Sequence, residues 1–98
     1  MTRRIRVTPA TADDIADAYD YYEGQRTGLG EEFRGELHVA LGLLIEFSEA
    51  GPAVHGGLRR LLLRRFPYAV YYRITETTIV LRACLHQHSD PRIWSRRG

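Results

Sequence analysis

Near the end of the chain, two histidines have the residue type that RNA cleavage would require. His86 and His88 are two positions apart after an apolar run, so both side chains could face the same side of a strand. Imidazole is suited to general acid–base catalysis at neutral pH, which makes both histidines candidates for RNA cleavage. Two solvated histidines at the end of a strand would give the same pattern, so a purely structural role also fits.

The same segment does not predict a metal site. His86, His88 and Asp90 could supply three ligands, but the sequence has no second group of ligating residues to complete a site. The Gly56-Gly57 pair lacks the spacing and the following helix of a phosphate-binding loop. We therefore expect neither a metal nor a cofactor.

Alternation along three strand-like runs predicts a face that is not covered by helices. In the last run, Leu81, Ala83 and Leu85 should point toward the core, which leaves the intervening side chains outside. The residues expected on the uncovered face, a surface suited to phosphate or carboxylate, are Arg60, Arg64, Tyr71, Arg73, Arg82 and His86. Trp94 follows the last run and could either pack the tail over the sheet or stack on a base at this face.

Before these runs, the period of the apolar residues predicts two helices. Thr11 and Asp14 fit a capping box, and the first helix should run to about Glu23. The second helix should end where Gly51 takes a left-handed conformation, with Pro52 beyond it. The expected apolar stripes are Ala12, Ile15, Tyr19 and Tyr22 in the first helix, and Leu29, Phe33, Leu37, Leu41 and Leu44 in the second.

The complete order of elements reads β-α-α-β-β-β. Ile5 and Val7 alternate with arginines in a short first strand, and the later runs at 58–65, 68–75 and 78–86 should form an antiparallel meander. We therefore predict an α+β fold in which a helical hairpin packs on one face of a small antiparallel sheet.

Length, charge and cysteine content narrow the class of protein. The chain has 98 residues, one cysteine and no apolar run near the roughly 20 residues that span a membrane. These features predict one domain, a cytoplasmic location and no membrane partner. Residues 1–50 hold ten acids and five arginines, a net charge of −5, whereas residues 51–98 hold nine arginines and two acids, a net charge of +7. This asymmetry fits an anionic partner, or acidic helices that pair with a basic sheet.

Four short motifs follow one another in a characteristic order. They are D-D-I-A-D-A-Y at 13–19, G-G-L-R at 56–59 after Pro52, F-P-Y-A-V-Y-Y at 66–72 and L-H-x-x-x-D-P-x-x-W at 85–94. Together they resemble the RelE/ParE superfamily of toxins from bacterial type II toxin–antitoxin systems, the class linked to plasmid stabilization. The resemblance implies a single toxin domain over residues 1–98. It also implies a cognate antitoxin whose extended segment wraps the toxin in a hetero-oligomer.

Within this superfamily, RelE-like members cut messenger RNA on the ribosome, whereas ParE-like members inhibit DNA gyrase by binding. Nuclease members commonly have an arginine after the tyrosine that corresponds to Tyr68, and this chain has Ala69. A basic pair often follows the strand-end histidine, and here the sequence is Gln87-His88-Ser89. These departures favour a ParE-like gyrase inhibitor. The alternatives are a RelE-like endoribonuclease that acts through Arg64, Arg82, His86 and His88, and an inactive relative.

Overall fold

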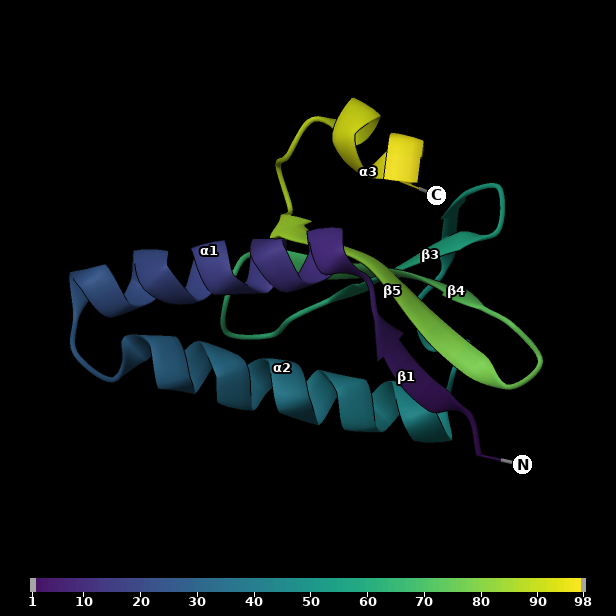
Figure 1. Cartoon of the computed structure of the whole chain (residues 1–98), viewed down its shortest axis with the longest axis horizontal. Coiled ribbons are helices and arrows are strands. Elements are labelled where there is room, and N and C mark those ends of the chain that lie inside the picture. The colour runs from purple at the N-terminus through teal and green to yellow at the C-terminus, as the bar shows by residue number, and fades with distance from the viewer. Residues whose placement is uncertain (1, 98) are drawn as a thin grey trace.

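Two antiparallel helices lie against one face of a five-stranded sheet, and a short third helix lies against the other face (Figure 1). The computed structural model describes residues 2–97. Its elements are β1 (Arg4–Val7), α1 (Pro9–Gln25), α2 (Leu29–Glu46), β2 (Ala53–His55), β3 (Leu58–Leu62), β4 (Tyr68–Ile74), β5 (Thr78–His86) and α3 (Pro91–Arg97). The predicted α+β fold and its order of elements are confirmed, and the structure adds the short strand β2 and the helix α3.

The sheet is mixed, not purely antiparallel as predicted. Its strand order is β1-β5-β4-β3-β2, and β3, β4 and β5 form the expected antiparallel meander. At the edge, β1 pairs in parallel with β5, so that Arg4 lies opposite Thr78 and Val7 opposite Leu81. A parallel pair requires a long connection that returns the chain to the same end of the sheet, and a run of alternating residues does not reveal it.

The helix α1 begins at Pro9, and its cap differs from the prediction. Thr8 is the N-cap, and its hydroxyl oxygen accepts a hydrogen bond from the Thr11 amide at 3.4 Å. Both threonine hydroxyls donate to the carbonyl oxygen of Leu81 in β5, at 2.8 and 2.9 Å. The predicted capping box of Thr11 and Asp14 is therefore wrong, because Thr8 is the N-cap and Thr11 is buried within the first turn of the helix.

The larger core lies between the sheet and the helical hairpin. The stripe predicted for α2 is confirmed, with Phe33, Leu37 and Leu44 buried. In α1, Ala18 and Tyr22 are buried and Ile15 packs against the core, whereas Ala12 is exposed and Tyr19 lies over Gly30 of α2. The stripe predicted for α1 is thus wrong at Ala12 and Tyr19. Four aromatic rings close this core at the hairpin end, and they belong to Tyr22, Phe33, Phe66 and Tyr68.

A β-bulge reverses the faces of the last strand. Tyr71 pairs with Ala83 and Tyr72 with Leu81, so Arg82 is an extra residue without a direct partner. Beyond it, Ala83 and Leu85 belong to the cluster beneath α3, and Cys84 belongs to the core beneath the hairpin. The prediction that Ala83 and Leu85 face the helices is therefore wrong, because one inserted residue changes the phase of the alternation.

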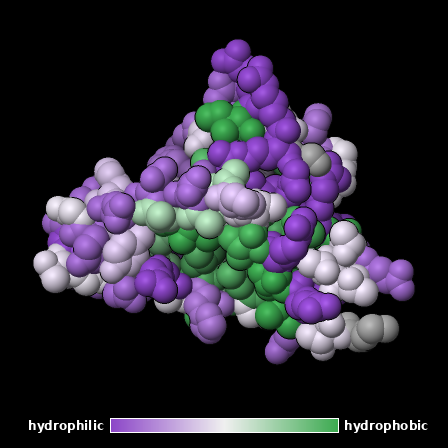
Figure 2. Space-filling model, in the orientation of Figure 1, coloured by the Kyte–Doolittle hydropathy of each residue, from purple (hydrophilic) through white to green (hydrophobic). Residues whose placement is uncertain are grey.

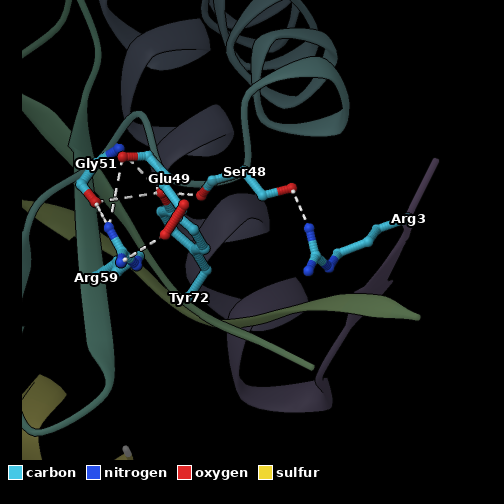
Figure 3. Close-up of polar contacts among 6 residues, drawn as sticks. All are labelled: Arg3, Ser48, Glu49, Gly51, Arg59 and Tyr72. Atoms are coloured by element: carbon cyan, nitrogen blue, oxygen red, sulfur yellow. Dashed lines mark hydrogen bonds and ion pairs between the residues drawn. The ribbon is translucent and has the colours of Figure 1, made fainter. Parts of the chain in front are cut away.

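A buried network fixes the connection between α2 and β2 (Figure 3). The Tyr72 hydroxyl donates to the carbonyl oxygen of Ser48 at 2.8 Å and accepts from the Gly51 amide at 2.9 Å. Arg59 donates to the carbonyl oxygen of Gly51 at 2.9 Å. Gly51 is not in the left-handed conformation that was predicted, since only Gly28 and Gly56 have positive φ among the described residues. Glycine is needed at position 51 because the backbone there lies close to β3: a Cβ atom would lie 2.5 Å from the carbonyl oxygen of Arg60.

The helix α3 covers part of the outer face, which is the side of the sheet opposite α1 and α2. The Trp94 ring stacks on Tyr71 with a centroid distance of 4.9 Å and an interplanar angle of 15°. Arg97 forms an ion pair with Asp14 of α1, and the Arg82 Nε donates to the Arg97 carbonyl oxygen at 2.6 Å. The Asp14 carboxylate also accepts the Cys84 amide at 3.0 Å, next to the bulge. Asp14 therefore joins α1, β5 and α3.

Candidate functional site

Three of the six residues predicted for the outer face lie there. Arg60 lies opposite Tyr71 across β3 and β4, and Arg73 lies two positions further along β4. Tyr71 is fully buried beneath Trp94, so packing is the role that the structure shows for both rings. The Arg73 guanidinium packs against the turn at Gly57. The aromatic part of this face is therefore covered, whereas Arg60 and Arg73 stay partly accessible and Leu62 is exposed.

The other three residues lie elsewhere, and the prediction of one shared face is wrong for them. Arg82 is the bulge residue, and it points to the last turn of α3. His86 lies opposite Tyr68, with 5.6 Å between the ring centroids, and the Tyr68 side chain packs against the core beneath the helices. Arg64 follows β3 and lines a groove beside α2.

The four residues proposed for RNA cleavage consequently lie in three separate places. Arg64 lines the groove beside α2, and Arg82 lines a different hollow at the start of α1. His86 and His88 are together at the end of β5, where the His86 Nδ1 accepts the His88 backbone amide at 3.1 Å. A cleavage site needs a base beside the 2′-hydroxyl and a cation beside the same phosphate. These four side chains do not form that arrangement.

The Asp90 carboxylate accepts hydrogen bonds at the N-terminus of α3. It accepts the backbone amide of Arg92 at 2.9 Å and forms an ion pair with the Arg92 guanidinium at 2.6 Å. These hydrogen bonds from Arg92 hold the pKa of the Asp90 carboxyl below its usual value. Within residues 2–97, no group of three or more histidines, cysteines or acids is placed to hold a metal ion.

An apolar groove lies between α2 and β3, and we call it the α2–β3 groove. Its volume is about 550 Å³, and Val39, Leu43 and Leu62 on its walls are 67%, 43% and 49% exposed. Figure 2 shows apolar side chains reaching the surface along the C-terminal half of α2. The complete lining is Glu36, Val39, Ala40, Leu43, Leu61, Leu62, Leu63 and Arg64. Sequence reasoning missed this groove, although Val39 and Leu43 are four residues apart and lie off the core stripe, which is a recognisable second stripe.

One wall of the α2–β3 groove is an open strand edge. In register, β2 reaches only Leu58 and Arg59 of β3. From Leu61 onward, the edge of β3 away from β4 has no strand partner within the described part of the chain. The groove therefore combines apolar walls with unpaired backbone groups, and this combination suits an added extended segment.

Cys84 is a packing residue, not a nucleophile. Its side chain is buried in the core beneath the helices. Burial, together with the nearby Asp14 carboxylate, raises the pKa of the Cys84 thiol to about 12. The thiolate, which is the reactive form, is therefore scarce at neutral pH.

One comparison with known proteins identifies the family, and another identifies a similar fold. A family model described as the ParE toxin of the type II toxin–antitoxin system parDE matches residues 5–91. Among solved structures, one described as a chromosomal ParDE toxin–antitoxin system from P. aeruginosa is similar to this fold with a TM-score of 0.77 at 19% identity. That match covers 87% of this chain and 96% of the other. A search of curated proteins gave no match. Of the helices described, none has both the length and the apolar character needed to cross a membrane.

Proposed function

Because this chain belongs to the ParE toxin family of type II toxin–antitoxin systems, we propose that it inhibits DNA gyrase by binding and is neutralised by a cognate antitoxin in the cytoplasm. A single observation carries the choice of a binding mechanism over RNA cleavage. Arg64, Arg82 and the histidine pair lie at three different places. A protein that acts by docking needs a surface, whereas a nuclease needs these groups around one phosphate.

The α2–β3 groove is the proposed antitoxin site. An extended apolar segment could pair with the free edge of β3 and place alternate side chains between Val39, Leu43 and Leu62. Glu36 and Arg64 at the rim would fix its register through polar contacts. Burying these exposed apolar side chains would supply most of the binding free energy, at about 25 cal/mol per Å².

The cellular target is tested by expressing the toxin in bacteria without antitoxin. We expect an early fall in labelled thymidine incorporation while labelled methionine incorporation continues, and the toxin should stabilise cleaved DNA when mixed with purified gyrase. The variants His86→Ala and Arg82→Gln should stay toxic. An immediate fall in methionine incorporation, with toxicity lost in His86→Ala, would show that the protein is a ribosome-dependent mRNA endoribonuclease instead.

The antitoxin site is tested with a matched pair of charge insertions. Leu43 lies in the groove and Ile93 on α3, and the two side chains are 43% and 45% exposed. Leu43→Glu should remain toxic but escape neutralisation by co-expressed cognate antitoxin, because a carboxylate is placed against an apolar segment. Ile93→Glu should be neutralised like the unmodified toxin. If Leu43→Glu is neutralised as well, the antitoxin binds elsewhere.

A further inference from the structure

The charge carried by the strands is entirely positive. They contain six arginines and no acidic residue, and the arginines are Arg4, Arg6, Arg59, Arg60, Arg73 and Arg82. In β1, Ile5 packs against the core beneath the helices, so Arg4 and Arg6 project from the outer face. Two residues apart on one strand, their Cα atoms are roughly 7 Å apart. This spacing is on the scale of neighbouring phosphates along a nucleic-acid strand.

A third exposed cation belongs to the last turn of α3, which lies near the end of β1. The end of β1 leads directly into Thr8, which lines one hollow together with Arg82 and Arg97. Asp14 holds Arg97 at this hollow, and the preceding residue Arg96, in the same helical turn, is exposed. We call Arg4, Arg6 and Arg96 the basic strip.

The basic strip differs from the cations on the helical side because no acid neutralises it. On the helical side, Arg26 and Arg65 both pair with Glu32, and Arg34 pairs with Glu31. Within residues 2–97, by contrast, the side chains of the strip make no hydrogen bond and no ion pair. Exposed, unpaired guanidinium groups on one face raise the local positive potential and attract a polyanion.

The surroundings of the strip favour duplex DNA over single-stranded nucleic acid. Single strands are bound mainly by stacking their bases on accessible aromatic rings. On the outer face, the rings of Tyr71 and Trp94 are stacked on each other, and both residues are buried. The strip can therefore contact a phosphate backbone but offers no platform for bases. Its neighbour Thr78, opposite Arg4, is polar and suits a phosphate contact better than an apolar protein interface.

We propose that the basic strip binds the phosphate backbone of duplex DNA directly and without sequence preference. The contact does not depend on gyrase being the target. In a complex with gyrase, it would place the toxin against the DNA that the enzyme holds. Each guanidinium that neutralises a phosphate releases condensed counterions, so the affinity should fall steeply with salt.

The test is fluorescence anisotropy of a labelled random-sequence DNA duplex titrated with the purified toxin over a series of salt concentrations. The double variant Arg4→Gln/Arg6→Gln should bind about tenfold more weakly or worse, and its slope of log affinity against log salt should be smaller by about 2. The control Arg26→Gln/Arg34→Gln removes the same two charges from the helical side and should bind as the unmodified toxin does. Arg96→Gln should reduce the slope by about 1 and provides a second reading if β1 does not tolerate the double change.

Three results would overturn the proposal. Equal weakening in the two double variants would mean that net charge alone drives binding. Tighter binding to single-stranded RNA, or displacement of the duplex by low concentrations of an acidic peptide, would assign the strip to another class of partner. Because gyrase is absent from this assay, its result is independent of the gyrase test. DNA binding without gyrase inhibition would leave this inference standing, and the reverse result would leave the proposed function standing.

Discussion

Replacing Tyr72 with phenylalanine removes one hydroxyl and leaves the buried ring in place. That hydroxyl donates to the Ser48 carbonyl oxygen at 2.8 Å and accepts from the Gly51 amide at 2.9 Å. Each hydrogen bond contributes about 1 kcal/mol net, and a buried amide left without a partner adds to the loss, so we expect the free energy of unfolding to fall by about 2–3 kcal/mol. For a domain of this size, this corresponds to a fall in Tm on the order of 10–20 °C.

The neighbouring tyrosine supplies the matched control. Tyr71 is as fully buried as Tyr72, but its hydroxyl has no hydrogen-bond partner among the described residues. Tyr71→Phe should therefore leave the free energy of unfolding unchanged or raise it by up to about 1 kcal/mol. Urea and thermal unfolding, followed by far-UV circular dichroism and Trp94 fluorescence, measure both variants. If the two substitutions lower the free energy of unfolding equally, the hydrogen bonds of the Tyr72 hydroxyl do not contribute to stability beyond the packing of its ring.

The pH dependence of the same pair gives a second reading. Burial raises the pKa of the Tyr72 hydroxyl above its usual value. The stability that this group contributes is therefore fully present below the unfolded pKa of about 10 and is lost as the pH rises through the higher folded pKa. The difference in unfolding free energy between the unmodified protein and Tyr72→Phe should stay constant from pH 6 to about 9 and should shrink above about 10. A difference that grows in alkaline solution would contradict this reasoning.

Three further substitutions or reagents test other contacts. Asp14→Ala should lower the free energy of unfolding by about 2 kcal/mol, because Arg97 and the Cys84 amide lose their acceptor. It should also make Trp94 more accessible to a fluorescence quencher. An unchanged quenching constant would show that α3 is held in place without Asp14. In the folded protein, Cys84 should react with a maleimide at neutral pH far more slowly than in the unfolded chain, since burial raises the pKa of its thiol to about 12. Equal reaction rates in the folded and unfolded protein would show that the thiol is not buried. Gly51→Ala should lower the free energy of unfolding by about 3 kcal/mol or more, because the added Cβ atom has no room. Gly42→Ala, where α2 leaves open space, should raise it by about 0.5–1 kcal/mol. If thermal unfolding shows no loss of stability in Gly51→Ala, the close contact at Gly51 is excluded.

The sequence was sufficient for the elements whose period runs undisturbed. Phe33, Leu37 and Leu44 recur at helical spacing, and all three are buried in α2. The meander of β3, β4 and β5 likewise follows from three consecutive runs with short connections. In these elements, local periodicity and tertiary packing agree, so the pattern alone leads to the structure.

The failures have physical causes that lie outside the local pattern. The bulge at Arg82 is set by pairing with β4, and one extra residue moves Cys84 and His86 to the helical side. The helix α3 did have a signal, because Asp90 followed by Pro91 is a favourable cap and first position. The candidate site was mispredicted because residues were assigned to faces by alternation alone. The α2–β3 groove depends on how two elements far apart in sequence approach each other.

The pairing of the first strand with the last has a consequence for how the chain folds during synthesis. The backbone contacts of β1 are made with residues 77–81, more than seventy positions further along the chain. The helical hairpin can form early because its contacts are local, but β1 has nothing to pair with until β5 has been translated. A chain that stops before residue 78 therefore has both amphipathic helices and the strands β3 and β4, but it lacks β5, which joins β1 to the rest of the sheet. The native sheet therefore cannot be completed until β5 has been synthesised, which leaves an interval in which an antitoxin already present can reach the incomplete toxin.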